Sequence, residues 1–431
     1  MIYERLTDLF VCAGTKYLTA VDAGTKYPRL NLGAEYPASV REQPVMSSQH
    51  EIGGLVRAGF GDFLGRPAKG VKLSVDCTFV YLTDEEDSQP IICEAPVSWY
   101  DTRHGNRSPE YRAYYTDNEV TESMQPGDFM LVAGKVGGGL LMVVTPHGST
   151  IEHQLSTLFG ARSGTGSLLA ASIKESEILL PIRLLLESLG VNLETSLEDD
   201  DVLLEQIQEK FPSGFPTTRL FSGYARAVCE PTDPLEQPDG ALMTWMDFEE
   251  RLFRLLERSI VKQRLQQGFG ESGDDVDEFI KVSLSIQNRR KSRSGHAFEN
   301  HLETIFVQHG LRFEKGSPAR TTENSKKPDF LFPGFSEYEN QNFPVSRLRL
   351  LGAKTTCKDR WRQVLSEGDR VATKHLITLE PGVSENQTAE MQARALKLVV
   401  PLPLHVSYKQ GQRDWLLSLT EFIQDVKAAQ G

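Results

Sequence analysis

The chain of 431 residues has few cysteines, no long apolar run and no excess of positive charge. Its five cysteines are widely spaced and contain no CxxC pair, which argues against a disulfide framework and a zinc site. No segment approaches the roughly 18 consecutive apolar residues of a membrane span. The start, MIYERLTDLF, lacks a basic leader followed by an apolar core. We therefore expect a cytoplasmic protein with no membrane partner.

The net charge of −12 does not exclude a nucleic-acid partner, because whole-chain charge averages an acidic scaffold with local basic patches. Acidic residues concentrate at 84–87, 194–205 and 274–278. One basic cluster stands out, comprising Arg289, Arg290, Lys291 and Arg293. A solvated surface or a helix boundary would explain this cluster as well as a nucleic-acid contact would.

The segment 347–369 carries the strongest chemical signal. An apolar run of strand character ends at Lys354, and the pair Pro328-Asp329 precedes it. Hydrolysis of a phosphodiester needs divalent metal held by carboxylates and a cation near the attacking water or the phosphate. Asp329 and Lys354 supply a carboxylate and a cation, so the segment predicts a nuclease.

The second acid of this site must come from an unusual position. Nucleases of this type usually place it two residues before the lysine, as (D/E)xK, but that position is Gly352. Glu367 is the candidate, because a helix beginning near Lys358 would carry it on the same face as Arg360, seven residues earlier. The alternative is a helix with ordinary solvated charges.

At these residues the chain resembles the catalytic domain of the EcoRII-type restriction endonucleases. The resemblance rests on the step of thirteen residues from Lys354 to Glu367 and on the runs KTTCKDRWRQ, KKPDFLFP (326–333) and NRRKSRSGHAFENHLETIFVQHGLR (288–312). It implies a variant PD-(D/E)xK fold whose acid has moved onto the helix. Asp329, Lys354 and Glu367 would then be catalytic, and Asp329 and Glu367 would hold Mg²⁺.

The resemblance also implies that Lys358, Asp359 and Arg360 read the C:G pairs of a DNA target. Their chemistry agrees, because Lys and Arg suit the guanine O6 and N7 acceptors and Asp suits the cytosine amino donor. The alternative is that Lys358 and Arg360 touch phosphates only, which would affect affinity but not sequence choice.

The helix HAFENHLETIF is expected to bury Phe298, Leu302, Ile305 and Phe306. Glu299, on another face, is a possible additional acid of the site, although a solvated role is the simpler reading. Three histidines of this region, at 296, 301 and 309, lack the four-residue step of a helical ligand pair and are expected to be structural.

The pattern along the chain predicts three parts. Residues 1–165 are mostly strand and turn, with strands at 71–82 and 91–100, a hairpin at 129–144 and a helix capped by Ser149. Residues 166–205 form a weakly patterned linker that ends in an acidic run. Residues 206–431 alternate helices and strands, so we expect an α/β domain there.

The N-terminal part resembles, more faintly, the DNA-binding effector domain of the EcoRII-type enzymes, which is a mainly β pseudobarrel with two arms that grip the major groove. The resemblance rests on YLTAVDAG, SSQHEIGG (47–54) and SWYDTRHGNRSPEYRA (98–113), and it departs by an insertion between residues 24 and 47 and by a shorter second arm. It implies DNA contacts from one arm by Gln49 and His50, and from the other by Arg103, His104, Arg107, Glu110 and Arg112. The alternative is a strand pair with its aromatic residues in the core and its arginines in water.

Together these features predict a Mg²⁺-dependent, sequence-specific endonuclease of double-stranded DNA that acts in bacterial restriction-modification, with the N-terminal domain binding DNA and regulating the nuclease. A homodimer is expected, because a two-fold symmetric target needs two active sites. One alternative is a nuclease that depends on methylated cytosine. Another is a DNA-binding regulator whose nuclease centre is inactive.

Overall fold

The computed structural model describes residues 5–23, 50–85, 89–103, 108–161, 168–173, 178–191, 200–270, 272–357 and 360–431, with the backbone only at residues 291 and 324. The chain divides into two compact units. Unit 1 comprises Met1–Thr195 and Gly382–Asn386, and unit 2 comprises Ser196–Pro381 and Gln387–Gly431. The division therefore falls between residues 195 and 196.

Unit 1 is built on one eight-stranded sheet with the order β2-β5-β4-β3-β7-β6-β1-β8. Neighbouring strands are antiparallel except β3 and β7, which are parallel. The strands are β1 (Phe10–Tyr17), β2 (Glu51–Ile52), β3 (Leu73–Tyr81), β4 (Ile91–Asp101), β5 (Tyr111–Tyr114), β6 (Phe129–Lys135), β7 (Leu140–Thr145) and β8 (Leu169–Ala171). The expected mainly β architecture is confirmed.

The two faces of this sheet are both covered, and the alternation along β6 shows it. Phe129 and Leu131 belong to one apolar core and Met130 and Val132 to another, as expected when successive side chains point to opposite faces. The helices of the unit are α2 (Phe60–Leu64), α3 (Glu119–Ser123), α4 (Thr150–Leu158) and α5 (Leu180–Ser188). Ser149 caps α4 by accepting a hydrogen bond from the Glu152 amide at 3.0 Å, as predicted.

The interval 166–205, expected to be a linker, contains ordered elements. Strand β8 pairs with β1, and α5 contributes Ile182, Leu185 and Leu186 to the first core. Apolar periodicity over only nine residues gave too weak a signal for the packing of α5 to be read from the sequence.

Unit 2 contains a four-stranded mixed sheet with the order β12-β11-β10-β9. The central strands β10 and β11 are parallel, as are β11 and β12, and β9 runs antiparallel to β10. The strands are β9 (Phe330–Phe332), β10 (Arg349–Lys354), β11 (Lys374–Thr378) and β12 (Leu396–Val399). With the helices around it, this sheet confirms the expected α/β fold.

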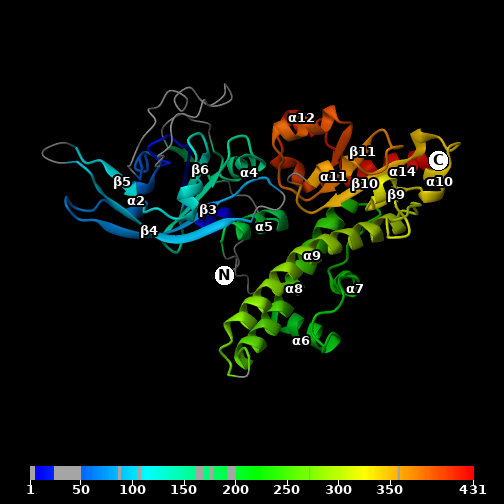
Figure 1. Ribbon diagram of the computed structural model, residues 1–431, viewed down its shortest axis with the longest axis horizontal. Coiled ribbons are helices and arrows are strands. Elements are labelled where there is room, and N and C mark those ends of the chain that lie inside the picture. The colour runs from blue at the N-terminus through cyan, green and yellow to red at the C-terminus, as the bar shows by residue number, and fades with distance from the viewer. Residues whose placement is uncertain are drawn as a thin grey trace. The chain divides into compact units, whose positions relative to one another are not determined.

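The helices of unit 2 include two long ones, α8 and α9, that lie side by side as a helical hairpin (Figure 1). The C-terminal half of α9 carries the predicted core stripe, in which Phe298, Leu302, Ile305 and Phe306 are all fully buried. The helices are α6 (Asp200–Lys210), α7 (Thr218–Val228), α8 (Pro238–Gln267), α9 (Val276–Gln308), α10 (Phe335–Glu339), α11 (Trp361–Leu365), α12 (Glu385–Ala393), α13 (Gln410–Arg413) and α14 (Leu419–Gln430).

All five cysteines carry free thiols. Across the described residues, no helix combines the length and the apolar character that crossing a membrane requires.

Candidate active site

The antiparallel pairing of β9 with β10 brings Asp329 and Lys354 together. Asp329 immediately precedes β9, and Lys354 is the last residue of β10. The Lys354 Nζ atom donates a hydrogen bond to Asp329 Oδ2 at 2.8 Å, and the Ala353 amide donates to the same oxygen at 2.7 Å. The cation and the first carboxylate predicted from the sequence are therefore neighbours.

Glu367 lies beyond the helix that was expected to carry it. Helix α11 spans only five residues and ends at Leu365, and Glu367 stands in the following turn, where its amide donates to the Val364 carbonyl at 3.1 Å. Gly368 takes a positive φ of 60°, a conformation that favours glycine and closes this turn. The expectation of a helical face shared by Arg360 and Glu367 is wrong, because Arg360 is the N-cap of a helix too short to reach Glu367.

The close approach of α11 to β10 explains why the acid is absent from the strand. A Cβ atom at Gly352 would lie only 2.5 Å from Val364 Cγ2, which is too near for any side chain without rearrangement. A carboxylate at the usual (D/E)xK position would collide with this helix. A second acid would therefore have to come from another element, and the turn after α11 carries the candidate, Glu367.

Glu367 is buried, with 8% of its surface exposed, and its Oε2 atom has no hydrogen-bond partner among the described residues. Burial and, after it, the negative charge of Asp329 raise the pKa of Glu367 to about 7, against the opposing charges of Lys354, Lys326 and Lys374. A buried carboxylate oxygen without a partner is an uncompensated cost that a bound cation would remove.

The donor set fits Mg²⁺. This ion prefers oxygen ligands and keeps several of its waters, so it needs only one or two carboxylates from the protein. Asp329 and Glu367 provide two. Within the described ranges, no group of three or more His, Cys, Asp or Glu side chains is arranged to hold a metal ion, so water or backbone atoms would complete the coordination.

The family model described as EcoRII C terminal matches residues 253–423, a segment that contains the three residues of this site. This segment is similar to the EcoRII C-terminal family. The resemblance expected from the motifs at 288–312, 326–333 and 354–367 is thereby confirmed.

Two curated proteins to which the chain is similar are restriction enzymes. The chain is 42% identical over 225 residues to the type II restriction enzyme EcoRII of Escherichia coli, which covers 52% of this chain and 53% of that protein. It is 26% identical over 197 residues to the type II restriction enzyme SsoII of Shigella sonnei, covering 42% and 63% respectively. The chain thus spans roughly half to two thirds of the length of these relatives.

Solved structures with a related chain include complexes with DNA. Metal-depleted Ecl18kI in complex with uncleaved DNA matches with a TM-score of 0.42 and 19% identity, over 53% of this chain and 84% of that chain. The complex of the restriction endonuclease PspGI with substrate DNA matches with a TM-score of 0.38 and 15% identity, over 53% and 92%.

The segment expected to read bases is described only in part. Lys358 and Asp359 lie outside the described residues, and Arg360 is half-buried at the start of α11. Just before them, the Cys357 amide donates to the buried Glu380 Oε2 at 2.6 Å. Sequence reasoning missed Glu380, because a single acid after an apolar strand carries no distinctive spacing.

Lys374 is a second residue of this region that sequence reasoning missed. Its Nζ atom donates to the Leu365 carbonyl, at the end of α11, at 2.5 Å. Burial lowers the pKa of Lys374, against the raising effect of Asp369, Glu367 and Glu323. Lys374 therefore fixes the start of the turn that carries Glu367.

Glu299 forms an ion pair with Lys315, whose Nζ atom lies 2.8 Å from the Glu299 Oε2 atom. The neighbouring histidine at 301 is fully buried, and its Nε2 atom lies 2.9 Å from Glu249 Oε2. Burial lowers the pKa of His301. A role for Glu299 as an additional acid stays a prediction.

The basic cluster of the domain packs helices together. Arg293 is buried, pairs with Glu249 of α8 at 2.9 Å and also contacts Glu250, and its guanidinium lies 4.0 Å from the centre of the Phe253 ring. Arg290 pairs with Glu257 at 2.5 Å. A solvated surface is therefore the wrong description for Arg293.

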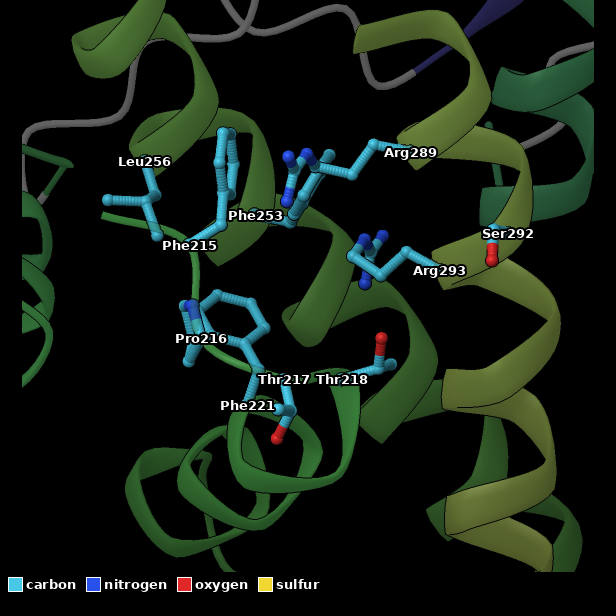
Figure 2. Close-up of a pocket in the computed structure, with 10 residues that line it drawn as sticks. All are labelled: Phe215, Pro216, Thr217, Thr218, Phe221, Phe253, Leu256, Arg289, Ser292 and Arg293. Atoms are coloured by element: carbon cyan, nitrogen blue, oxygen red, sulfur yellow. The ribbon is translucent and has the colours of Figure 1, made fainter. Parts of the chain in front are cut away.

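A cavity of about 260 Å³ lies beside Arg293, between the start of α7, α8 and α9 (Figure 2). Arg289 closes one side, with its guanidinium 4.3 Å from the centre of the Phe215 ring. The cavity walls are aromatic and hydroxylic, formed by Phe215, Pro216, Thr217, Thr218, Phe221, Phe253, Leu256, Arg289, Ser292 and Arg293.

In unit 1, the described residues of the second expected arm are paired with one another, whereas His50 of the first arm lies beside Asp117. Arg103 Nε donates to Glu110 Oε2 at 2.6 Å, and Arg112 Nη2 donates to Glu110 Oε1 at 2.7 Å and also contacts Glu51. His50 Nδ1 lies 3.2 Å from Asp117 Oδ1. The other expected contacts, Gln49, His104 and Arg107, lie outside the described residues.

The aromatic residues of this region divide between core and surface. Trp99 is fully buried in the core and donates to the Gly65 carbonyl at 3.0 Å, whereas Tyr100 and Tyr114 are half-exposed and stack with ring centres 5.0 Å apart. The alternative of a strand pair with core aromatics therefore describes Trp99 and not the stacked tyrosines.

Proposed function

We propose that this chain is a type II restriction endonuclease of the EcoRII type, which hydrolyses phosphodiester bonds of double-stranded DNA at a specific sequence with Mg²⁺ as cofactor. One observation carries the proposal: the Asp329–Lys354 pair and the buried Glu367, whose Oε2 atom has no hydrogen-bond partner among the described residues, interact within a segment that matches the EcoRII C-terminal family. The 42% identity to the EcoRII enzyme over 225 residues supports the same activity.

Asp329 and Glu367 would hold the Mg²⁺ ion, which supplies a Lewis acid for the phosphate and a water of lowered pKa. Lys354 is held by Asp329, so its ammonium group stands beside the metal ligands, where it can neutralise charge on the phosphate. Burial of Glu367 keeps bulk water from one of the carboxylates. Arg360, with Lys358 and Asp359, would read the C:G pairs of the target.

Unit 1 is proposed to bind DNA and to regulate the nuclease or add to its specificity. Its candidate contacts are Arg103, Arg112 and His50, together with the stacked pair Tyr100 and Tyr114. The arginines are engaged by Glu110 and Glu51, so a phosphate would have to compete with these carboxylates. DNA binding by unit 1 should therefore weaken steeply as salt rises.

The test is cleavage of duplex DNA of known sequence, unmethylated and methylated at cytosine, by the full chain and three variants. Asp329→Ala, Lys354→Ala and Glu367→Ala should each abolish Mg²⁺-dependent cleavage and leave DNA binding in a gel-shift assay largely intact. Glu278→Gln is the matched control, because this carboxylate is engaged by Arg264 of α8 and has no place in the proposed site, and it should cut at the wild-type rate.

Cleavage by Glu367→Ala at the wild-type rate would contradict the assignment of the second acid. Cleavage of methylated DNA alone would identify a modification-dependent enzyme. Binding without cleavage by the wild-type protein would identify a DNA-binding regulator.

A further inference from the structure

The turn that carries Glu367 is held by a short loop elsewhere in unit 2. The Gly368 amide donates a hydrogen bond to Thr322 Oγ1 at 3.3 Å, and the Asp369 amide donates to Glu323 Oε2 at 3.2 Å. Gly368 and Thr322 are buried, so this amide needs a partner within the protein. Two neighbouring side chains of one loop therefore accept the two backbone amides that follow Glu367.

Glu323 is itself fixed by Tyr338, a buried residue of α10. The Tyr338 hydroxyl donates to the Glu323 carboxylate, with distances of 2.8 and 2.6 Å to its two oxygens, and accepts from the Arg370 amide at 3.3 Å. Partial burial acts to raise the pKa of Glu323, but the hydrogen bonds from Tyr338 and from backbone amides lower it below its usual value. An ionised carboxylate is a strong acceptor for the Asp369 amide.

The loop that holds the turn also leads into Asp329. The Thr322 amide donates to the Lys326 carbonyl at 2.8 Å, and the Lys326 amide donates to the Glu323 carbonyl at 3.2 Å, which closes the segment here called the 322–326 loop. Only Lys327 and Pro328 separate this loop from Asp329. The segment that presents the first carboxylate therefore also holds the turn that presents Glu367.

This connection has a chemical consequence. Mg²⁺ requires nearly ideal octahedral geometry, with ligand oxygens at about 2.0–2.1 Å, so two carboxylates that share one ion must keep a fixed separation. An acid on β10 would be fixed relative to Asp329 by the pairing of β10 with β9. Glu367 stands in a turn, outside that pairing, so its separation from Asp329 must be fixed by other contacts.

We propose that the 322–326 loop sets the separation between Asp329 and Glu367, with Glu323 as its positioning residue. This role rests on the proposed function, in which Asp329 and Glu367 hold Mg²⁺. Glu323 acts through the backbone of the turn, by accepting the Asp369 amide, and contacts neither the metal nor the DNA.

The first test is binding of Mn²⁺ to the full chain without DNA, measured by isothermal titration calorimetry. Mn²⁺ takes the same oxygen ligands as Mg²⁺ and serves as the probe. Glu323→Ala should weaken Mn²⁺ binding about tenfold, because the turn loses an acceptor that orients a metal ligand. Glu323→Gln keeps an oxygen that can accept the Asp369 amide, so its Mn²⁺ affinity should stay within about threefold of the wild type.

The second test separates positioning from stability. The Mg²⁺ concentration for half-maximal cleavage should rise about tenfold in Glu323→Ala, with most of the wild-type rate recovered at saturating Mg²⁺ and DNA affinity unchanged in a gel-shift assay. A loss of folded protein would instead lower the rate at every Mg²⁺ concentration. Glu337→Gln is the matched control, because Glu337 adjoins Tyr338 in α10 but pairs with Arg312 at 3.7 Å, and it should match the wild type.

Thr322→Val provides a second variant in case Glu323→Ala does not fold. It keeps the shape of the side chain and removes the hydroxyl that accepts the Gly368 amide, so it should also weaken Mn²⁺ binding and raise the half-maximal Mg²⁺ concentration. Thermal unfolding of every variant identifies those that keep the fold.

Three outcomes would overturn the role of the 322–326 loop. Wild-type Mn²⁺ affinity in folded Glu323→Ala and Thr322→Val would do so and leave the proposed function intact, provided that Asp329→Ala and Glu367→Ala lose Mn²⁺ binding. Equal losses in Glu323→Gln and Glu323→Ala would assign the effect to the charge of Glu323 and not to positioning. Mn²⁺ binding that survives both Asp329→Ala and Glu367→Ala would remove the proposed metal site, and the role of the loop with it.

Discussion

Glu367→Gln should make the metal-free protein more stable at pH 8 and inactive as a nuclease. Glu367 is buried, and burial together with Asp329 raises its pKa from 4.5 to about 7. A raised pKa means that the folded state holds the proton more tightly than the unfolded state does. The stabilisation that accompanies the neutral acid is present below pH 4.5 and is lost as the pH rises from 4.5 to about 7.

The size of the effect follows from the same values. Each pKa unit corresponds to about 1.36 kcal/mol, so the rise in pKa corresponds to about 3 kcal/mol of unfolding free energy at pH 8. Glutamine is neutral at every pH and nearly the same shape, so it avoids this cost. The variant should gain about 2–3 kcal/mol at pH 8 and almost nothing near pH 4.5.

The assay is urea unfolding of both proteins in EDTA at several pH values between 4.5 and 8. Glu299→Gln is the control, because Glu299 is paired with Lys315, and it should show no gain at pH 8. Added Mg²⁺ should stabilise the wild type at pH 8 and leave Glu367→Gln unchanged. Equal stability of the two metal-free proteins at pH 8, or a difference that does not change with pH, would refute the reasoning.

Two further predictions concern neighbouring residues. Gly352→Ala should lower the free energy of unfolding by about 1–3 kcal/mol, because the added methyl group overpacks against Val364. In a double-mutant cycle measured by urea unfolding, Val364→Ala should recover much of that loss. Additive effects of the two substitutions would show that the two residues do not compete for space. Arg360→Ala should cost about 1–3 kcal/mol of binding at cognate DNA and little at random DNA in equilibrium titrations; equal losses on both DNAs would make Arg360 a phosphate contact.

The parts of unit 2 that sequence could predict are those whose signal is local. The buried stripe with Phe298 and Leu302 follows from helical spacing, and Lys354 at the end of β10 follows from an apolar run that stops. Both features need only neighbours within the same element. The sequence also indicated Glu367 as the candidate for the acid missing at Gly352. This assignment stays a prediction, and the contact of Gly352 with Val364 gives a steric reason why the strand carries no acid.

What the sequence could not predict depends on distant partners. The buried state of Arg293 is set by Glu249 and Glu250 of α8, which are more than forty residues away in the chain. The early end of α11 is set by the turn at Gly368, where an added Cβ would lie 2.6 Å from Leu350 Cδ1 of the strand below. Neither the ion pairs of Arg293 nor the turn at Gly368 can be recognised from the charge or hydrophobicity of neighbouring residues in the sequence.

The contact between Gly352 and Val364 also bears on how such sites change over time. A protein that regained the acid on the strand would need two substitutions. One would add the carboxylate at position 352 and the other would replace Val364 by a smaller residue, and the first alone would destabilise the fold. Loss of Glu367 before both were in place would leave the site with one carboxylate. The proposed location of the second acid, Glu367, is therefore separated from the (D/E)xK arrangement by two coupled substitutions, of which the first alone would destabilise the protein.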